Sequence, residues 1–166
     1  MSDNGAMSAL APTVMHAPTA WSLRPMRASD LDAVVLLEQQ VYPHPWTRGN
    51  FADALAAGYH AQCVHQDTEL CGYVVAMAGV EEAHLLNITV ARHLQGQGHG
   101  HHLWQHLCAW APQVGAQRMW LEVRRSNVAA QAIYKHWGFE TVGERKNYYP
   151  AGRGQREDAV VMGLTL

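Results

Sequence analysis

The chain has 166 residues, of which 48% are hydrophobic and 16% are charged, and its formal net charge is −2. This length suits one folded domain, and the composition is that of ordinary globular proteins. The slightly negative charge argues against a broadly basic surface for nucleic acid, and no apolar run approaches the roughly 18 residues of a membrane-spanning helix.

Residues 1–20 contain mainly alanine, proline and small polar residues, without the basic and continuous apolar regions of a secretory signal. Such a segment buries too little surface to offset its ordering entropy, so we predict a disordered extension, followed by one domain over residues 21–166. The three cysteines show no C-x-x-C spacing. This pattern predicts reduced thiols in a cytoplasmic protein rather than disulfides or a zinc site.

The first third of the domain predicts a strand and two helices. The strand covers Trp21 to Met26, and the S-x-x-D sequence from Ser29 to Asp32 has the form of a capping box that opens a helix. Two prolines within Tyr42 to Trp46 end that helix. The resulting connector either packs as a plain loop or walls a substrate groove. Thr47 is a suitable N-cap for a second helix, Arg48 to Ala57.

Strands dominate the middle of the chain. His60 to His65 and Gly72 to Ala78 predict two neighbouring strands joined by a polar turn, and another strand begins at Ala83. Met119 to Arg124 alternates, with Met119, Leu121 and Val123 on one face and Trp120, Glu122 and Arg124 on the other.

The end of the chain predicts a helix and two closing strands. Ser126 and Asn127 start a helix that runs to Trp137. The strands are Phe139 to Val142 and Ala159 to Leu164, with a loop between them that holds Asn147 to Pro150 and Arg156 to Asp158.

A glycine-rich loop stands between the strand that ends at Val90 and a helix that we predict from His101. Gly96, Gly98 and Gly100 alternate with single polar residues. A glycine-rich turn at a helix start can direct several backbone N–H groups at one anion, and the helix dipole adds to the attraction. The loop therefore predicts a phosphate site, with a flexible surface loop as the plain alternative.

A dinucleotide-binding turn is a further alternative, because Glu122 follows Gly100 by about the twenty residues which that motif asks for. However, the glycines are spaced G-x-G-x-G, and five residues separate Val90 from Gly96.

His102 and His106 have the spacing of a helical zinc pair. Leu103 replaces the general-base glutamate of the H-E-x-x-H motif, and no third ligand is evident, so we predict no metal.

The sequence Gln95-Gly96-Gln97-Gly98-His99-Gly100 resembles the Q/R-x-x-G-x-G/A motif of the GNAT superfamily of N-acetyltransferases. Within that superfamily, residues 21–166 look similar to the bacterial ribosomal-protein-alanine N-acetyltransferases. The local matches are Pro45-Trp46, Trp120 to Arg124, Ser126 to Ala130, Ile133-Tyr134, Gly138-Phe139, Asn147 to Pro150 and Arg156 to Ala159. The chain departs from the family at Gly96, where arginine is frequent, and His99 or His101 are the candidates to replace that contact.

The resemblance implies a GNAT fold of the α/β (α+β) class, with a mixed, mostly antiparallel sheet of about six to seven strands flanked by helices. It implies acetyl-CoA as co-substrate and no metal. Main-chain groups of Ile88, Thr89 and Val90 would bind the pantetheine arm, and Asn127 would hydrogen-bond the cofactor. The pyrophosphate cradle would consist of Gly96, Gln97, Gly98, His99, Gly100 and His101.

The resemblance also assigns catalytic roles, with Glu122 as general base and Tyr134 as general acid toward the thiolate. Without it, Glu122 would be read as an ion pair with Arg118 or Arg124, and Tyr134 as helix packing. The substrate-binding residues would be Trp46, Asn147, Tyr148 and Tyr149.

The implied reaction is acetyl transfer to the N-terminal alanine of a small-subunit ribosomal protein, without direct nucleic acid or membrane binding. Alternatives are a GNAT enzyme that acts on lysine or small amines, and a non-catalytic acyl-CoA-binding module.

Overall fold

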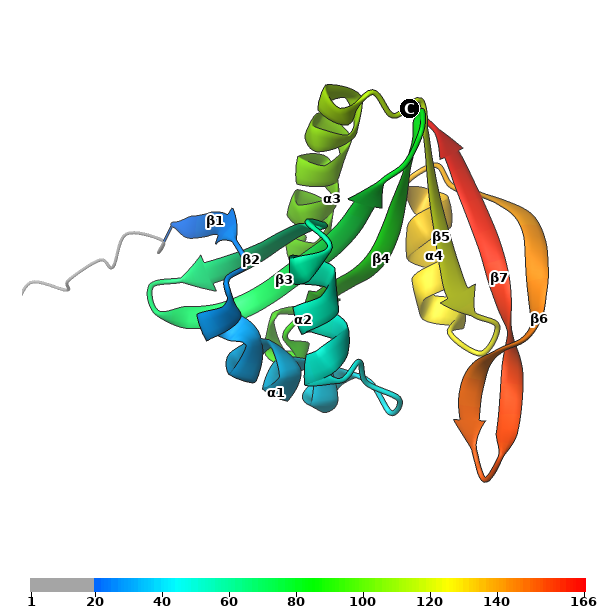
Figure 1. The fold of residues 1–166 in the computed structure, drawn as a ribbon, viewed down its shortest axis with the longest axis horizontal. Coiled ribbons are helices and arrows are strands. Elements are labelled where there is room, and N and C mark those ends of the chain that lie inside the picture. Colours follow the sequence, from blue (N-terminus) through cyan, green and yellow to red (C-terminus); the bar gives the residue numbers. More distant parts are fainter. Residues whose placement is uncertain (1–19) are drawn as a thin grey trace, which may run out of the picture.

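The computed structural model describes residues 20–166, whose arrangement Figure 1 shows. The predicted disordered extension, residues 1–20, lies outside this range apart from Ala20. The described residues form one sheet of seven strands. The strands are β1 (Trp21–Pro25), β2 (His60–Gln66), β3 (Glu69–Ala78), β4 (Glu82–Val90), β5 (Arg118–Arg124), β6 (Glu140–Gly152) and β7 (Gln155–Thr165).

The strand order is β1-β2-β3-β4-β5-β7-β6, and every neighbouring pair is antiparallel except β4 and β5. The predicted mixed, mostly antiparallel sheet flanked by helices is therefore confirmed. The α-helices are α1 (Leu31–Val41), α2 (Arg48–Ala56), α3 (His99–Trp110) and α4 (Val128–His136), and the 3₁₀ turns are η1 (Ala28–Asp30), η2 (Arg92–Leu94) and η3 (Ala111–Val114). No helix in the described part of the chain is both long and apolar enough to cross a membrane.

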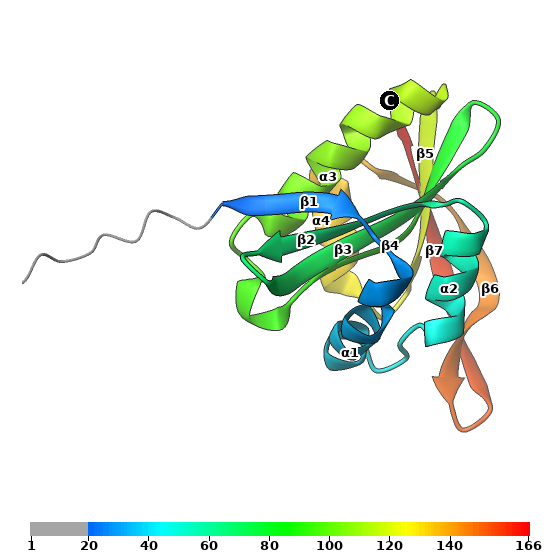
Figure 2. The same ribbon diagram turned by 60° about the vertical axis from the view of Figure 1, so that its left-hand side comes forward.

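Two apolar clusters hold the layers together. Leu103 and Leu107 of α3, four residues apart on one helical face, belong to the first cluster, with residues of β3, β4, β5 and β7. Val34 of α1 and Phe51 of α2 belong to the second, on the opposite face. Figure 2 shows the same division, with α1 and α2 on one side of the sheet and α3 and α4 on the other. Each fully buried side chain of this size contributes about 1.5–3 kcal/mol.

The alternation predicted for β5 is confirmed. Met119, Leu121 and Val123 are at most 6% exposed, and the residues between them face the other side of the sheet. This register brings Glu122 to the face opposite the α3 core.

The sheet has two halves, β1 to β4 and β5 to β7, and they pair with each other over a short stretch. Strand β4 pairs with β5 over Glu82 to His84 and Arg118 to Trp120, and the pairing stops there. Beyond this point β4 continues toward Val90 and β5 toward Arg124 along separate directions, which Figure 1 shows as a splay. The later residues of β4 therefore have β3 as a strand neighbour on one side, and no strand from residues 20–166 on the other.

The predicted helix starts are partly correct. Thr47 caps α2, and its hydroxyl accepts from Asn50 N at 3.2 Å. The capping box from Ser29 to Asp32 is wrong, because the turn η1 precedes α1. Asp30, the last residue of η1, accepts from Arg27 N at 2.7 Å through its carboxylate, which also pairs with Arg24 at 2.7 Å.

Helix α3 begins at His99, two residues before the predicted start, because Gly98 takes the N-cap position with a left-handed φ of +88°. Glycine adopts this conformation without the strain that a side chain brings. His99 and Gly100 therefore belong to the first helical turn.

The predicted loop between the last two strands is also wrong. Asn147 to Pro150 lies within β6, and Arg156 to Asp158 lies within β7, so the two strands form one long hairpin with its turn at residues 153–154. The hairpin does not show the regular alternation of a strand pair, because its pairing register shifts between Arg145 and Tyr149, where Asn147 has a φ of +51°.

Candidate active site

The open edge of β4 is the first part of the site. Ala91 N donates to Cys71 O at 2.8 Å, so the peptide groups of Thr89, two residues earlier, also face β3. Those of Ile88 and Val90 alternate with them and face the side on which β5 has separated. Their N–H groups are therefore directed to the space between the two halves of the sheet.

The carbonyl groups of the same two residues already have side-chain partners. The Tyr42 hydroxyl donates to Ile88 O at 3.1 Å, and the Gln95 amide donates to Val90 O at 2.9 Å. Thr89 differs from its neighbours, because its peptide faces β3 and its buried hydroxyl contacts Tyr42 and Asn87. Of the three β4 residues expected at the cofactor, Ile88 and Val90 direct their N–H groups to this space, and Thr89 does not.

The glycine loop leads from β4 to the N-terminus of α3. Gly96 and Gly98 have φ angles of +74° and +88°, and a Cβ on either would meet no atom within 4 Å. The first helical bond runs from His102 N to Gly98 O at 3.2 Å, so the N–H groups of residues 99–101 remain free of helical partners. The Gln97 side chain turns back to His93 O at 3.1 Å. The loop thus leaves backbone donors uncovered at the positive end of a helix, which suits an anion.

The histidines beside this loop differ in what they contribute. The His99 ring stacks on Trp21, with centroids 3.6 Å apart and planes at 12°. Burial, and then the charge of His102, lowers the pKa of His99, so its ring is neutral near pH 7. His101 is exposed. As replacement for the arginine that is frequent at Gly96, His99 therefore offers its main-chain N–H rather than a charged ring.

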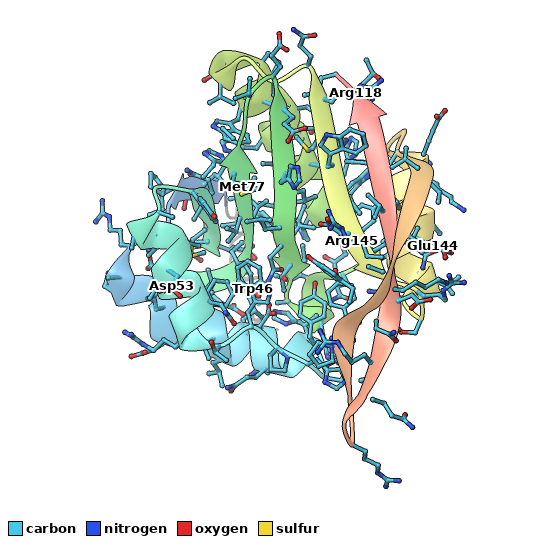
Figure 3. The ribbon with its side chains drawn as sticks, turned by 45° about the vertical axis from the view of Figure 1, so that its right-hand side comes forward. Trp46, Asp53, Met77, Arg118, Glu144 and Arg145 are labelled. Carbon is cyan, nitrogen blue, oxygen red and sulfur yellow. The ribbon has the colours of Figure 1, made fainter. Side chains whose placement is uncertain are left out.

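Glu122 projects from β5 with its side chain 13% exposed, and its Oε1 lies 3.1 Å from Nε of Arg145 on β6. The ion-pair partner is thus neither Arg118 nor Arg124 but a residue two strands away. Figure 3 shows Arg145 on the same face of the molecule as Trp46. Because the Arg145 side chain is 54% exposed, the pair is partly solvated and weak.

Tyr134 projects from α4, and its ring contacts Trp137 and Phe139 with centroids 5.7 and 5.9 Å apart. Burial raises the pKa of its phenol, and the nearby Tyr42 and Tyr149 raise it further. The phenol consequently keeps its proton throughout the neutral range, as a general acid must. Tyr42 comes from the α1–α2 connector and Tyr149 from β6, so both halves of the molecule contribute side chains near Tyr134.

Asn127, expected at the cofactor, is also the N-cap of α4. Its Oδ1 accepts from Ala130 N at 3.1 Å. This bond leaves the side-chain NH₂ as the group that can meet a ligand.

The tyrosines of the hairpin are fixed by the irregular segment of β6. Arg156 donates to Asn147 O and Tyr148 O, each at 2.6 Å, and Asp158 accepts from Asn147 N at 2.9 Å. The Tyr149 hydroxyl donates to the main-chain oxygen of Glu122 at 3.0 Å. Of the residues expected at the substrate, Asn147 thus shapes the bulge, and Tyr148 and Tyr149 stand beside Glu122 and Arg145.

The connector between α1 and α2 approaches the site from the half of the molecule that contains β1 to β4. It is held by Glu38, a residue that the sequence did not predict for the site. The Trp46 ring packs on Phe51 with centroids 5.1 Å apart, and Trp46 N donates to the buried Glu38 carboxylate at 2.9 Å. The sequence contained one signal of this role, because Glu38 lies on the buried stripe of α1 with Leu31 and Val34. A carboxylate at such a position needs internal donors.

The histidine pair considered for zinc is separated. His106 Nε2 lies 3.0 Å from His60 Nε2, while His102 meets the ring of His99 edge-on at 6.5 Å. Over residues 20–166 no group of three or more His, Cys, Asp or Glu side chains is arranged to hold a metal ion.

The chain is similar to known proteins over most of its length. Residues 31–139 match the model of the acetyltransferase (GNAT) family. The ribosomal protein bS18-alanine N-acetyltransferase of Escherichia coli K12 is 36% identical over 141 residues, which cover 85% of this chain and 95% of that protein. The putative enzyme of the same name in Bacillus subtilis is 33% identical over 150 residues, which cover 89% and 97%.

A solved structure shows that the fold is also similar to that of a known protein. The crystal structure of the ribosomal-protein-S18-alanine N-acetyltransferase from Escherichia coli superposes with a TM-score of 0.79 at 34% identity, covering 88% of this chain and 94% of that one. The chain therefore belongs to the acetyltransferase (GNAT) family.

Proposed function

We propose that this protein transfers an acetyl group from acetyl-CoA to the α-amino group of the N-terminal alanine of ribosomal protein bS18. The observation that carries the proposal is the 33–36% identity with enzymes of this name over most of both chains. We take residues 21–166 as the catalytic domain, because they include every site residue described above.

The glycine loop and the edge of β4 fit a coenzyme A ester. The uncovered N–H groups of residues 99–101 suit its pyrophosphate, and the Asn127 amide adds a donor. The N–H groups of Ile88 and Val90 suit the carbonyl oxygens of the pantetheine arm and the thioester. Acetyl-CoA, when bound there, supplies an activated acyl group on sulfur.

Glu122 and Tyr134 then divide the proton transfers. Glu122 accepts the proton of the incoming amine, directly or through a water, while nitrogen bonds to the acyl carbon. Tyr134 donates its proton to the sulfur as the carbon–sulfur bond breaks. The β4 N–H groups stabilise the negative charge on the acyl oxygen during this exchange. Solvent then returns the proton from Glu122 to Tyr134, so the enzyme is unchanged.

An N-terminal amine suits this site better than a lysine. A free α-amino group has a pKa of about 8 and a lysine about 10.4, so near neutrality the lysine costs roughly 3 kcal/mol more to deprotonate. Trp46, Asn147, Tyr148 and Tyr149 would wall the groove for the first residues of the substrate. We further propose action in the cytoplasm on the free ribosomal protein, because a net charge of −2 offers no broad attraction to RNA.

The function is tested with two sets of peptides. One set begins with the alanine of bS18, and the other carries a blocked N-terminus and an internal lysine. We expect the alanine peptides to react on the order of a hundredfold faster near pH 7, from the difference in amine pKa. Equal rates would favour a lysine or small-amine acetyltransferase, and acetyl-CoA binding without turnover on any amine would favour a non-catalytic module.

Replacing Glu122 with Gln should reduce kcat by about a hundredfold at pH 7, because the amide keeps the shape but accepts no proton. The loss should shrink as pH rises toward 9, because the substrate amine, with a pKa of about 8, then deprotonates by itself. Rates measured over this range for Glu122→Gln and for Arg145→Gln separate the carboxylate from its ion pair, since the second variant should stay near wild type. A fully active Glu122→Gln enzyme at pH 7 would remove Glu122 as the base.

A further inference from the structure

We propose that Glu38 is a positioning residue that ties the substrate-side connector to the acyl-binding strand. The substrate in this inference rests on the proposed function, but the tether itself does not. Glu38 is 2% exposed, and its carboxylate joins three elements. Oε1 accepts from Trp46 N of the connector at 2.9 Å, and Oε2 accepts from Asn87 Nδ2 of β4 at 3.1 Å and from the Tyr73 hydroxyl of β3.

Packing alone does not explain a carboxylate at this position. Glu38 shares the buried stripe of α1 with Leu31, Val34 and Leu37, where an apolar side chain would fill the space without desolvating a charge. All three of its donors are neutral groups rather than a lysine or arginine. The carboxylate therefore serves to gather hydrogen-bond donors, and one of them is the main chain of the connector.

The network continues from Asn87 to the reaction site. The Thr89 hydroxyl lies 2.9 Å from Asn87 Oδ1 and 3.2 Å from the Tyr42 hydroxyl, which donates to Ile88 O at 3.1 Å. Ile88 is a β4 residue that faces the separation from β5, and Tyr42 influences the pKa of Tyr134. The two ends of the connector, Tyr42 and Trp46, are thus both held to β4 through buried polar groups.

The tether should act on the acceptor side of the reaction. The peptide groups of β4 are also fixed by the ladder with β3, whereas Trp46 lies in a connector between two helices. Removing the Glu38 carboxylate therefore releases the Trp46 end of the connector and leaves the strand in place. Affinity for acetyl-CoA should change little, and the peptide KM should rise.

The experiment compares Glu38→Leu and Glu38→Gln with Val34→Ala. Val34 is fully buried on the same stripe of α1 but belongs to no polar contact described here, so its truncation controls for lost stability. We expect the peptide KM to rise about tenfold or more in Glu38→Leu, because hydrogen bonds to a charged group are lost. The Kd for acetyl-CoA should stay within about threefold of the wild-type value. Glu38→Gln should fall between, because its amide satisfies either Trp46 N or Asn87 but not both.

Amide hydrogen exchange at Trp46 tests the tether without any substrate. The Trp46 N–H should exchange on the order of tenfold faster in Glu38→Leu than in the wild type, and at the wild-type rate in Val34→Ala. Unchanged Trp46 exchange in a folded Glu38→Leu protein would overturn the tether. Equal rises of the peptide KM in Glu38→Leu and Val34→Ala would reduce Glu38 to a stabilising residue. A third outcome is faster Trp46 exchange in Glu38→Leu together with a wild-type protein that does not acetylate alanine peptides. This result would support the tether and reject the proposed function.

Discussion

Replacing Tyr134 with Phe is expected to lower kcat by about two to three orders of magnitude, within the usual range of about 10²–10⁴-fold for a general acid. The phenylalanine ring can keep the contacts with Trp137 and Phe139, so the fold should be unaffected. Because burial raises the pKa of Tyr134, its phenol is protonated throughout the assay range. The loss should therefore be nearly constant between pH 6 and 9, in contrast to the pH-dependent loss in Glu122→Gln.

Steady-state rates and acetyl-CoA affinity distinguish this role from packing. Acetyl-CoA Kd should change less than about threefold, since the phenol acts on the departing sulfur rather than on binding. Tyr59→Phe is the matched control, because Tyr59 lies between α2 and β2 and takes no part in the described site. If Tyr134→Phe kept the wild-type kcat, Tyr134 would not be the general acid, and solvent would protonate the thiolate.

The elements that the sequence predicted best depend on neighbours along the chain. Strand β5 follows from its alternation, and the start of α2 follows from Thr47, whose hydroxyl accepts from Asn50 N in the structure. The glycine loop was recognised for the same reason, since its left-handed residues and the following helix lie within a few positions. Its helix start was misplaced by two residues, because a glycine at the N-cap leaves no side-chain signal.

The parts that the sequence did not predict depend on partners far along the chain. Two of the three donors to Glu38 come from Tyr73 and Asn87, 35 and 49 residues away. Glu122 and Arg145 meet only because β7 lies between β5 and β6. The polar residues of the β6–β7 hairpin predict a loop because asparagine and its polar neighbours are typical of turns, and Asn147 does adopt a left-handed φ. In the structure, Arg156 donates to Asn147 O and Asp158 accepts from Asn147 N, and these bonds hold the segment in the sheet.

The glycine loop should control cofactor affinity, and Gly98→Asp tests it most directly. The position has a φ of +88°, so a side chain adds backbone strain, but a Cβ there would meet no atom of another residue within 4 Å. Its carboxylate would stand beside the N-terminus of α3, where the pyrophosphate is expected. A like charge about 5 Å away at an effective dielectric of about 20 costs roughly 3 kcal/mol. Calorimetry should therefore show acetyl-CoA Kd weakened on the order of a hundredfold or more.

Two controls separate charge from backbone strain in this experiment. Gly98→Asn has nearly the same shape and the same left-handed φ as Gly98→Asp but no charge, so it should weaken binding far less. Gly58→Asp places the same side chain at another left-handed glycine, with φ of +74° and open space, at the end of α2. It should lose similar stability and keep acetyl-CoA affinity. If Gly98→Asp binds acetyl-CoA as tightly as Gly98→Asn while both remain folded by circular dichroism, the pyrophosphate does not lie at this loop.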